Sequence, residues 1–357
     1  MKKTEGLAAC LEKGEAALTT APHERRYLTG FASSAGYVLT TVEAAYFLTD
    51  FRYIEAARRA IPDMECLCGD RPAEVLKELL QRHGIGRLLV SAEHTSIKQL
   101  ADWQRAMKGV CTVAADGRYD ARMRLLRLVK TPDELEKIRQ AQELTDAGYG
   151  HILSYIRPGR TERDIALELE FFIRRQGAEG VAFDFIVVSG PNSSLPHGVP
   201  GERAVEKGDF ITMDFGAVVD GWHSDMTRTV AVGSVTDEQR RVYETVLRAQ
   251  ETALGTLRAG LSCRAGDAAA RDVIREAGYG DCFGHSTGHG VGVEIHEEPR
   301  LSPAAPEGEL LQPGSVVTVE PGIYLSGKFG VRIEDMAAIT ETGCENLTKS
   351  PKTLTIL

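Results

Sequence analysis

The sequence lacks the features of membrane-bound and nucleic-acid-binding proteins. No apolar run in the 357 residues approaches the length of a membrane span. Near the start, Glu5, Glu12, Lys13 and Glu15 break up any apolar signal core. There is no basic run and no patch of interleaved basic and aromatic residues, and the net charge is −9 at pH 7. We therefore expect a soluble, cytoplasmic protein that binds neither nucleic acid nor a membrane.

Cysteine is present, but not in a metal-binding or disulfide pattern. The seven cysteines are odd in number and scattered, and no pair of CxxC elements occurs. The only close pair, Cys66 and Cys68, is explained by two neighbours on one face of a strand. We expect all seven to be reduced thiols.

The length and a hydrophobic content of 43% are sufficient for a large core and two domains. Strand and helix signals alternate up to about residue 125, which indicates a self-sufficient α/β domain without a catalytic constellation. The predicted strands are 37–41, 44–49 and 87–92, and the predicted helices are 51–60, 72–84 and 97–107. A capping box at Thr131 and Glu134 then opens a long helix. We expect domains of residues 1–125 and 126–357.

The segment 207–227, KGDFITMDFGAVVDGWHSDMT, is predicted to form a hairpin that carries two aspartates. Its first half alternates apolar and polar residues, and Asp220-Gly221 supplies a two-residue turn. In this register, the residue numbers of each facing pair add up to 441. Asp225 therefore faces Gly216 and lies diagonal to Asp214, and the Cα atoms of the two aspartates are about 7–8 Å apart. The glycine is expected to leave room beside the carboxylate. Two solvated aspartates or a site for a hard divalent cation would each explain this pair.

A faint internal repeat indicates two similar halves in the C-terminal part. The first block contains Gly159, Thr161, Arg163, Arg174 and Gly177, which recur 101 positions later as Gly260, Ser262, Arg264, Arg275 and Gly278. The second contains Gly208, Thr212 and Asp214, which recur 106 positions later as Gly314, Thr318 and Glu320. The first block frames a helix with a hydroxyl N-cap and a glycine stop. We infer a duplicated unit of a helix followed by strands.

The repeat predicts a cluster of four carboxylates. In the return strand GVRIED, Glu334 occupies the position that Asp225 has in the first half. Two such units would fold their sheets into one curved surface, on which Asp214 and Asp225 face Glu320 and Glu334. Four buried carboxylates are costly at neutral pH and require roughly two divalent cations.

Histidines offer the nitrogen ligand that such a site can use. His285, His289 and His296 fall within twelve positions, and His197 lies in a Pro-His-Gly loop. Glycines around His289 allow close approach to a site. A single histidine is more often a structural residue, but all these elements together indicate a dinuclear metal site. Strand alternation at 293–296 would turn His296 into the site without contact to a metal.

The motifs MDFG, SDMTRT, HSTGHGVG, EIHE, VEPGIY and VRIED, in this order, resemble the pita-bread metallopeptidases, specifically the proline-selective branch of aminopeptidase P and prolidase. The N-terminal RYLTGFASSAGYVLTT and AAYFLTDFRY resemble the creatinase-type domain of that branch, and SGPNSSLPHG matches as well. The resemblance covers nearly the whole chain. It implies an α/β (α+β) protein with a creatinase-like N-terminal α/β domain and a C-terminal pseudo-symmetric pita-bread domain. The N-terminal domain disfavours methionine aminopeptidase, which has a single pita-bread domain.

The resemblance also implies a role for each site residue. Asp214 would bind one metal ion, His289 and Glu320 the other, and Asp225 and Glu334 would bridge both. All five positions hold the expected residue types, unlike creatinase-like and binding-only relatives. The implied substrate contacts are His197 and His296, which would also handle protons, and His285, Tyr324 and Arg332 on the leaving-group side.

The chemistry of the residues agrees with these roles. Two close cations lower the pKa of a bridging water and give hydroxide at neutral pH. Glu320 would take the proton and pass it to the leaving nitrogen, while the substrate histidines would hold the carbonyl or the oxyanion. Structural roles stay open for three residues: Tyr324 as core, Arg332 as an ion-pair partner, and His285 as a residue that holds its loop.

We expect an Xaa-Pro peptidase, with aminopeptidase P preferred over the alternative, an Xaa-Pro dipeptidase (prolidase). A catalytically silent peptide-binding protein on the same fold is a further alternative. Oxygen-rich ligation with one histidine suits manganese, with cobalt or zinc as substitutes. The expected partner is a peptide with proline at its second position. The resemblance adds a homodimer in which one subunit's N-terminal domain borders the other's site.

Overall fold

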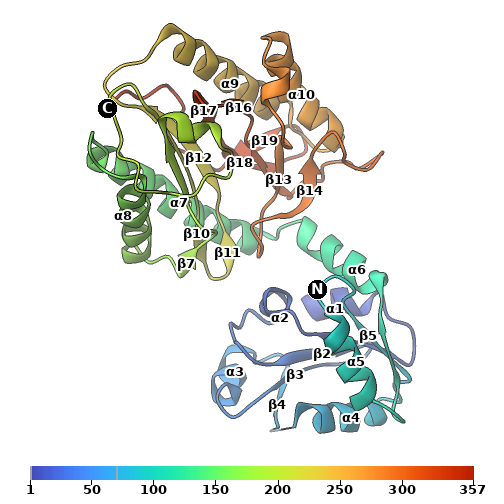
Figure 1. The fold of residues 1–357 in the computed structure, drawn as a ribbon. Helices are drawn as coiled ribbons and strands as arrows, with labels where there is room; N and C mark the ends of the chain where they lie inside the picture. Colours follow the sequence, from blue (N-terminus) through green and yellow to red (C-terminus); the bar gives the residue numbers. More distant parts are fainter. Residues whose placement is uncertain (1, 70) are drawn as a thin grey trace. The chain divides into compact units, whose positions relative to one another are not determined.

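The computed structural model describes residues 2–69 and 71–357 (Figure 1). The chain separates into two compact units, Met1–Arg127 (unit 1) and Leu128–Leu357 (unit 2). Within the described ranges, we find no helix that is both long enough and apolar enough to span a bilayer.

Unit 1 is built on one six-stranded mixed sheet with the order β4-β3-β2-β1-β5-β6. Its strands are β1 (Glu15–Thr19), β2 (Tyr37–Thr41), β3 (Ala45–Thr49), β4 (Glu65–Cys68), β5 (Arg87–Val90) and β6 (Thr112–Ala115). The β1–β2 and β2–β3 pairs are antiparallel, while β3–β4, β1–β5 and β5–β6 are parallel. The strands that the sequence predicts at 37–41, 44–49 and 87–92 all form.

Helices surround this sheet (Figure 1). They are α1 (Lys3–Ala8), α2 (Pro22–Thr29), α3 (Ile54–Ala60), α4 (Pro72–Arg82), α5 (Ile97–Ala106) and α6 (Gly117–Leu128). Helix α4 ends as predicted, since Gly84 follows it with a left-handed φ of 62°. Apolar residues of α4 pack on strand residues in one buried cluster, as Leu76, Leu79 and Leu88 illustrate.

Unit 2 contains four long helices and several short antiparallel sheets. The helices are α7 (Pro132–Tyr155), α8 (Glu162–Arg175), α9 (Asp237–Thr256) and α10 (Cys263–Glu276). The strands of its first half are β7 (Gly180–Val181), β8 (Ile186–Ser189), β9 (Phe210–Phe215), β10 (Ala217–Val219), β11 (Trp222–His223) and β12 (Met226–Ala231). Those of its second half are β13 (Gly288–Gly290), β14 (Glu297–Leu301), β15 (Val316–Val319), β16 (Gly322–Leu325), β17 (Phe329–Arg332), β18 (Asp335–Ile339) and β19 (Cys344–Asn346).

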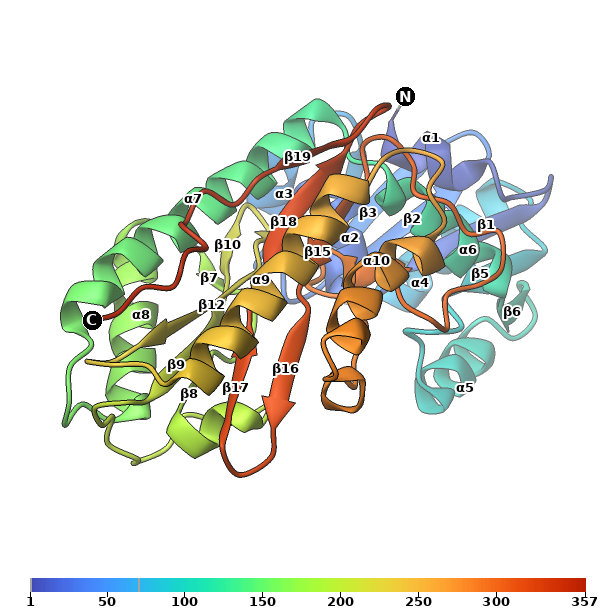
Figure 2. The same cartoon turned by 90° about the horizontal axis from the view of Figure 1, so that it is seen from above.

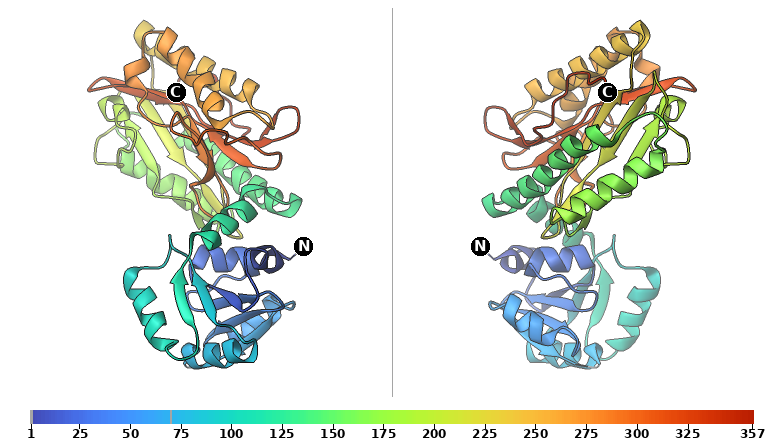
Figure 3. Two further views of the ribbon diagram at one scale, coloured as in Figure 1. Left: turned by 90° about the vertical axis from the view of Figure 1, so that its right-hand side faces the viewer. Right: turned by 90° about the vertical axis from the view of Figure 1, so that its left-hand side faces the viewer.

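Each half of unit 2 has its own hydrophobic core. One cluster joins α7 and α8 to the strands of the first half, with Ile211, Met213 and Phe215 fully buried. A second joins α9 and α10 to the strands of the second half. Figures 2 and 3 show each helix pair beside the strands of its own half. The apolar alternation of β9 is thus used as the sequence predicts, with its odd-numbered side chains in the core.

The internal repeat corresponds to repeated structure. Helices α8 and α10 both begin after a hydroxyl N-cap, Thr161 and Ser262, whose side chain accepts a hydrogen bond from the backbone. Both N-caps also form an isolated antiparallel bridge, to Ala204 and Leu310 respectively. The same local sequence therefore makes the same connection in each half.

Candidate metal centre

The hairpin that carries Asp214 and Asp225 has the predicted register. Asp220 and Gly221 have φ values of 49° and 80°, which fit a two-residue turn with both central residues left-handed. The pairs Val218–His223 and Thr227–Asp214 both obey the predicted register. Asp225 lies between β11 and β12, where the hairpin passes from one short sheet to another.

Gly216 has a different function from the one that the sequence suggested. A Cβ at this position would lie 1.9 Å from the Ser224 carbonyl oxygen. The glycine therefore permits the two backbones to approach at the break in the hairpin, and the expectation that it leaves room beside the carboxylate is wrong. The Ser224 backbone fills that space.

The second half repeats this arrangement. Glu320 follows β15 directly, as Asp214 lies near the end of β9. Glu334 lies between β17 and β18, in the same kind of break that holds Asp225. Glu334 is also joined to the first half, since its backbone N–H donates to the Thr227 carbonyl at 3.1 Å.

His289 in β13 brings carboxylates of both halves together. Its Nε2 atom lies 3.6 Å from Asp225 Oδ2 and 3.4 Å from Glu320 Oε1. Ligand atoms of Asp225, His289 and Glu334 all lie within 4.8 Å of one another. The Nδ1 atom of His289 is 3.0 Å from the Gly290 carbonyl oxygen, an acceptor that fixes the N–H there and leaves Nε2 as a lone-pair donor toward the carboxylates.

Asp214 joins the cluster through Arg332, which donates from Nη2 to Asp214 Oδ2 at 2.6 Å. The other carboxylate oxygen, Asp214 Oδ1, is buried and has no hydrogen-bond partner in the described part of the chain. A buried carboxylate oxygen without a donor is costly unless a cation approaches it. Four carboxylates and one imidazole form a donor set that fits hard or borderline divalent ions.

Burial gives this cluster unusual acid–base properties. Burial, together with Glu334, Asp214 and Glu320, raises the pKa of Asp225 well above its ordinary range. Burial raises the pKa of Glu320 to about 8 and lowers that of His289 to about 3. Each shift disfavours the charged form in the metal-free protein, and nearby cations would compensate the carboxylate charges.

Arg332, Tyr324 and His285 form one hydrogen-bonded chain beside the carboxylates. Arg332 Nη1 donates to the Tyr324 hydroxyl at 2.8 Å, and that hydroxyl lies 2.9 Å from His285 Nε2. Burial lowers the pKa of His285 to about 4, so this ring is neutral near pH 7. Arg332 does pair with an acid, Asp214. The hydrogen bonds place the guanidinium, the phenol and the imidazole together on one side of the site.

His296 lies next to His289, but not on a strand. The two rings meet edge to face with centroids 4.4 Å apart. Residues 293–296 form bends, and β14 begins only at Glu297. The prediction of strand alternation there is wrong, because local bonds such as that from the Glu294 N–H to Glu297 Oε1 hold a compact turn. Burial and Arg300 lower the pKa of His296.

His197 is exposed, in the loop that follows the 3₁₀ helix η1 (Gly190–Ser194). The preceding residue, Pro196, accepts a hydrogen bond from Arg332 Nη1 at 3.3 Å. Burial is the main cause that lowers the pKa of both His285 and His296, and His197 adds a smaller lowering effect to each. The structure thus brings the five predicted metal ligands together with His285, His296, Tyr324 and Arg332 in unit 2, whereas His197 lies on an exposed loop of the same unit.

Two threonines belong to the centre, although the sequence alone did not single them out. Thr227 donates to Glu334 Oε2 at 2.7 Å and accepts from Arg332 Nε at 3.0 Å. Thr318 donates to Glu320 Oε1 at 3.2 Å and accepts from the His289 N–H at 3.0 Å. Their signals were present, because Thr227 faces Asp214 in the hairpin register and Thr318 belongs to the repeat. Such partners orient metal-binding carboxylates.

Known proteins are similar to this chain in both fold and sequence. Residues 136–341 match the metallopeptidase family M24, and residues 11–129 match the creatinase/prolidase N-terminal domain. The Bacillus subtilis protein described as uncharacterized peptidase YqhT is 41% identical over 341 residues, which cover 95% of each chain.

Two solved structures are similar over almost the whole chain. One, described as an Xaa-Pro dipeptidase from Bacillus anthracis, is 42% identical with a TM-score of 0.94 and covers 100% of this chain and 99% of its own. Another, described as an X-Pro aminopeptidase from Thermotoga maritima, is 38% identical with a TM-score of 0.92 and covers 99% and 100%. Fold and site define a metallopeptidase with a pita-bread catalytic domain. The chain belongs to metallopeptidase family M24, whose members use divalent metal ions.

Proposed function

We propose that this metallopeptidase hydrolyses the bond between an N-terminal residue and a following proline. The observation that carries the proposal is the cluster of four carboxylates and one imidazole, buried except for the partly exposed Glu320, in which Asp214 Oδ1 lacks any partner in the described part of the chain. We assign residues 1–125 to a creatinase-type domain and residues 126–357 to the catalytic domain.

The five candidate ligands would hold two divalent ions. Asp214 would bind one ion, His289 and Glu320 the other, and Asp225 and Glu334 both. When bound, such ions lower the pKa of a water molecule and polarise the scissile carbonyl. Support for the bridging pair comes from their equivalent positions, since each lies between two strand segments of its own half. Manganese is our first choice of metal, with cobalt and zinc as substitutes.

The chain's own residues would position the substrate and move its proton. Glu320 is our candidate to carry a proton to the leaving nitrogen, because its carboxylate lies at the centre, 3.4 Å from His289 Nε2, and a carboxylate can accept and release a proton. Thr318 orients this carboxylate. His197 and His296 would donate hydrogen bonds to the substrate carbonyl.

The leaving-group side would be formed by His285, Tyr324 and Arg332. Their chain of hydrogen bonds fixes the guanidinium and the phenol relative to Asp214. The nitrogen of the bond before proline carries no hydrogen, so it cannot donate a hydrogen bond. A wall with few acceptor atoms in need of a hydrogen bond therefore suits this substrate. The names of both similar solved structures, an Xaa-Pro dipeptidase and an X-Pro aminopeptidase, support proline as the second residue.

Peptide length separates two candidate activities. We propose aminopeptidase P activity on longer peptides, which the likeness to the Thermotoga maritima aminopeptidase supports. Xaa-Pro dipeptidase activity is the second candidate, favoured by the likeness to the Bacillus anthracis dipeptidase. The test is to compare kcat/KM for an X-Pro dipeptide, an X-Pro-Y tripeptide and a longer X-Pro peptide, with manganese supplied and the matching X-Ala peptides as controls.

The length of the peptides that are cleaved decides between the two activities. Cleavage of X-Pro-Y and longer peptides identifies an aminopeptidase, and cleavage of the dipeptide alone identifies a dipeptidase. Equal rates on X-Ala peptides would contradict proline selectivity, and binding without turnover would contradict both activities.

We further propose a homodimer and a cytoplasmic location. All seven cysteines are free in the structure, which supports a reducing compartment. Light scattering of the full chain tests the dimer.

A further inference from the structure

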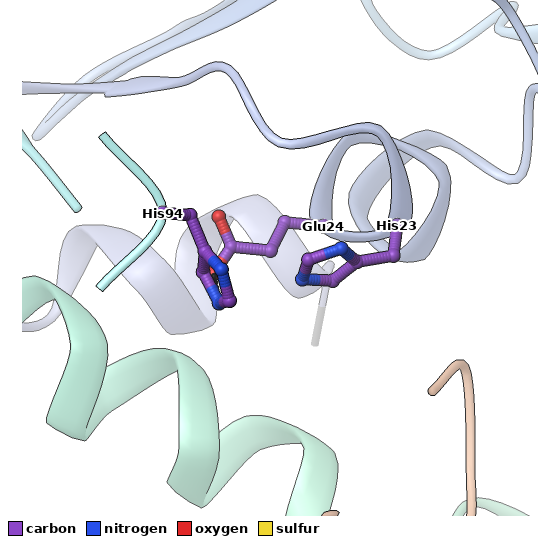
Figure 4. Close-up of side chains that lie close together, drawn as sticks. All are labelled: His23, Glu24 and His94. Carbon is purple, nitrogen blue, oxygen red and sulfur yellow. Dashed lines mark ion pairs between the residues drawn. The ribbon is translucent and has the colours of Figure 1, made fainter. Parts of the chain in front are cut away.

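Unit 1 contains a second group of ligating side chains, far in sequence from the candidate metal centre. His23 and Glu24 lie in the first turn of α2, and His94 lies in the turn that follows β5. Figure 4 shows the three side chains close together, with the His94 ring beside the Glu24 carboxylate. No residue of the candidate metal centre belongs to this unit.

The three side chains are close enough to share one ion. Ligand atoms of all three lie within 4.8 Å of one another, and His94 Nε2 is 4.0 Å from Glu24 Oε1. The rings of His23 and His94 meet at 78° with centroids 4.7 Å apart. Ligands of a tetrahedral zinc ion, each at 2.0–2.1 Å, are about 3.4 Å apart. A shift of about one ångström by the exposed turn of His94 would close this difference.

Helix α6 supports both sides of the group with neighbouring residues. The Tyr119 hydroxyl donates to Glu24 Oε2 at 2.7 Å, so this oxygen is held while Oε1 faces His94. Asp120 accepts from Ser91 Oγ at 2.5 Å and from the Ala92 N–H at 2.8 Å. Ser91 Oγ in turn accepts from the His94 N–H at 2.8 Å. Partners of this kind hold ligating groups in place at metal sites.

The chemistry of the group favours a borderline transition metal. Two imidazole nitrogens and one carboxylate oxygen are a ligand set for zinc, and the partly exposed His94 side of the group leaves a fourth position open to water. Burial raises the pKa of Glu24 to about 7, against the opposing effects of Tyr119, His94 and Arg127, and Asp120 adds to it.

We propose that His23, Glu24 and His94 bind one zinc-like divalent cation, which fastens the turn after β5 to the start of α2. None of these three residues belongs to the candidate metal centre of unit 2, and the proposal does not depend on the proposed peptidase activity.

The test counts zinc on the full-length chain. After removal of metal with a chelator, wild-type protein, His94→Ala and His23→Ala are each dialysed to equilibrium against graded zinc at pH 8, where imidazoles are neutral. The matched control is His151→Ala. His151 also pairs with a carboxylate, Glu168, at 2.6 Å, but it forms no three-ligand group within the described residues.

The proposal requires that His94→Ala and His23→Ala each bind one zinc ion fewer per chain than the wild type, or bind that ion at least tenfold more weakly. His151→Ala should match the wild type. Because the readout is a difference between variants, ions at the catalytic centre cancel. The His94 side chain is partly exposed, so its removal should leave the fold intact, which circular dichroism checks. Unchanged zinc number and affinity in both variants would overturn the proposal.

Discussion

Asp225→Asn should change activity and stability in opposite directions. Asp225 is 4% exposed, and ligand atoms of Glu334 and His289 lie within 4.8 Å of its carboxylate. Two unit charges 4.8 Å apart repel by about 3.5 kcal/mol at an effective dielectric constant of 20. Partial protonation relieves some of this repulsion in the metal-free protein, so the isosteric, neutral amide should raise its free energy of unfolding by about 1–3 kcal/mol.

With metal bound, the wild type should instead be more stable than Asp225→Asn. A metal present at 100 times its dissociation constant stabilises the wild type by about 2.7 kcal/mol. The amide offers one good ligand oxygen in place of two, so the variant should lose at least one ion and its activity. Urea denaturation with and without manganese, elemental analysis and an X-Pro-Y assay on the same preparations measure all three effects.

Asp209→Asn is the matched control. Asp209 is also a buried aspartate of unit 2, but it pairs with Arg203 at 2.6 Å. Its amide variant should lose stability without metal and should retain the ions. If Asp225→Asn kept two ions and wild-type turnover, or was less stable than the metal-free wild type, the assignment of Asp225 as a bridging ligand would fail.

Three further predictions address other parts of the protein. His296→Ala should lower kcat by about 10²–10³-fold with metal content intact, as for the loss of one oxyanion donor; loss of metal that excess manganese partly restores would instead identify a ligand, and a metal-replete variant at full speed would reject both roles. Asp335→Asn should lower the free energy of unfolding by about 3–5 kcal/mol in urea, because the buried Arg228 and the partly exposed Lys352 lie 2.7 and 2.8 Å from this buried carboxylate. Burial alone would raise the pKa of Asp335, but these two cations hold it below 3.8. The stabilisation should therefore be present above pH 3.8 and disappear as the pH falls through the lower folded-state pKa. A variant with the same acid sensitivity as the wild type would contradict this prediction. Deletion of residues 1–120 should broaden or abolish peptide-length selectivity while some metal binding remains, and unchanged kinetics of a well-folded truncation on every peptide length would argue against a selective role for that domain.

Local patterns in the sequence predicted the parts of the structure that depend on local interactions. The Asp220-Gly221 turn, the Thr131 capping box and the burial of Ile211 all follow from residues near each other in the chain. The internal repeat extended the prediction beyond neighbouring residues. It aligned Glu320 with Asp214 and so predicted that both carboxylates belong to one site. The residues of the candidate site could therefore be predicted from the sequence alone.

The two errors and the missed group of His23, Glu24 and His94 involve contacts that strand alternation and repeat spacing do not encode. Gly216 is explained by the Ser224 carbonyl, whose position depends on the break in the hairpin. The bends at 293–296 replace a strand because Glu297 bonds to the backbone of its own turn. His23 and His94 are 71 positions apart, and only the adjacent strands and helices of unit 1 bring them together.

The most direct test of the metal-centre assignment is a manganese titration of the metal-free enzyme with hydrolysis of an X-Pro-Y peptide as the readout. The His94→Ala chain is the best starting protein, because it lacks the proposed ion in unit 1. We predict no turnover without metal, a rate that rises until two ions are bound per chain, and no such rise in the same titration of Asp225→Asn. Full hydrolysis by the metal-free chain, or a maximal rate in Asp225→Asn, would contradict the account.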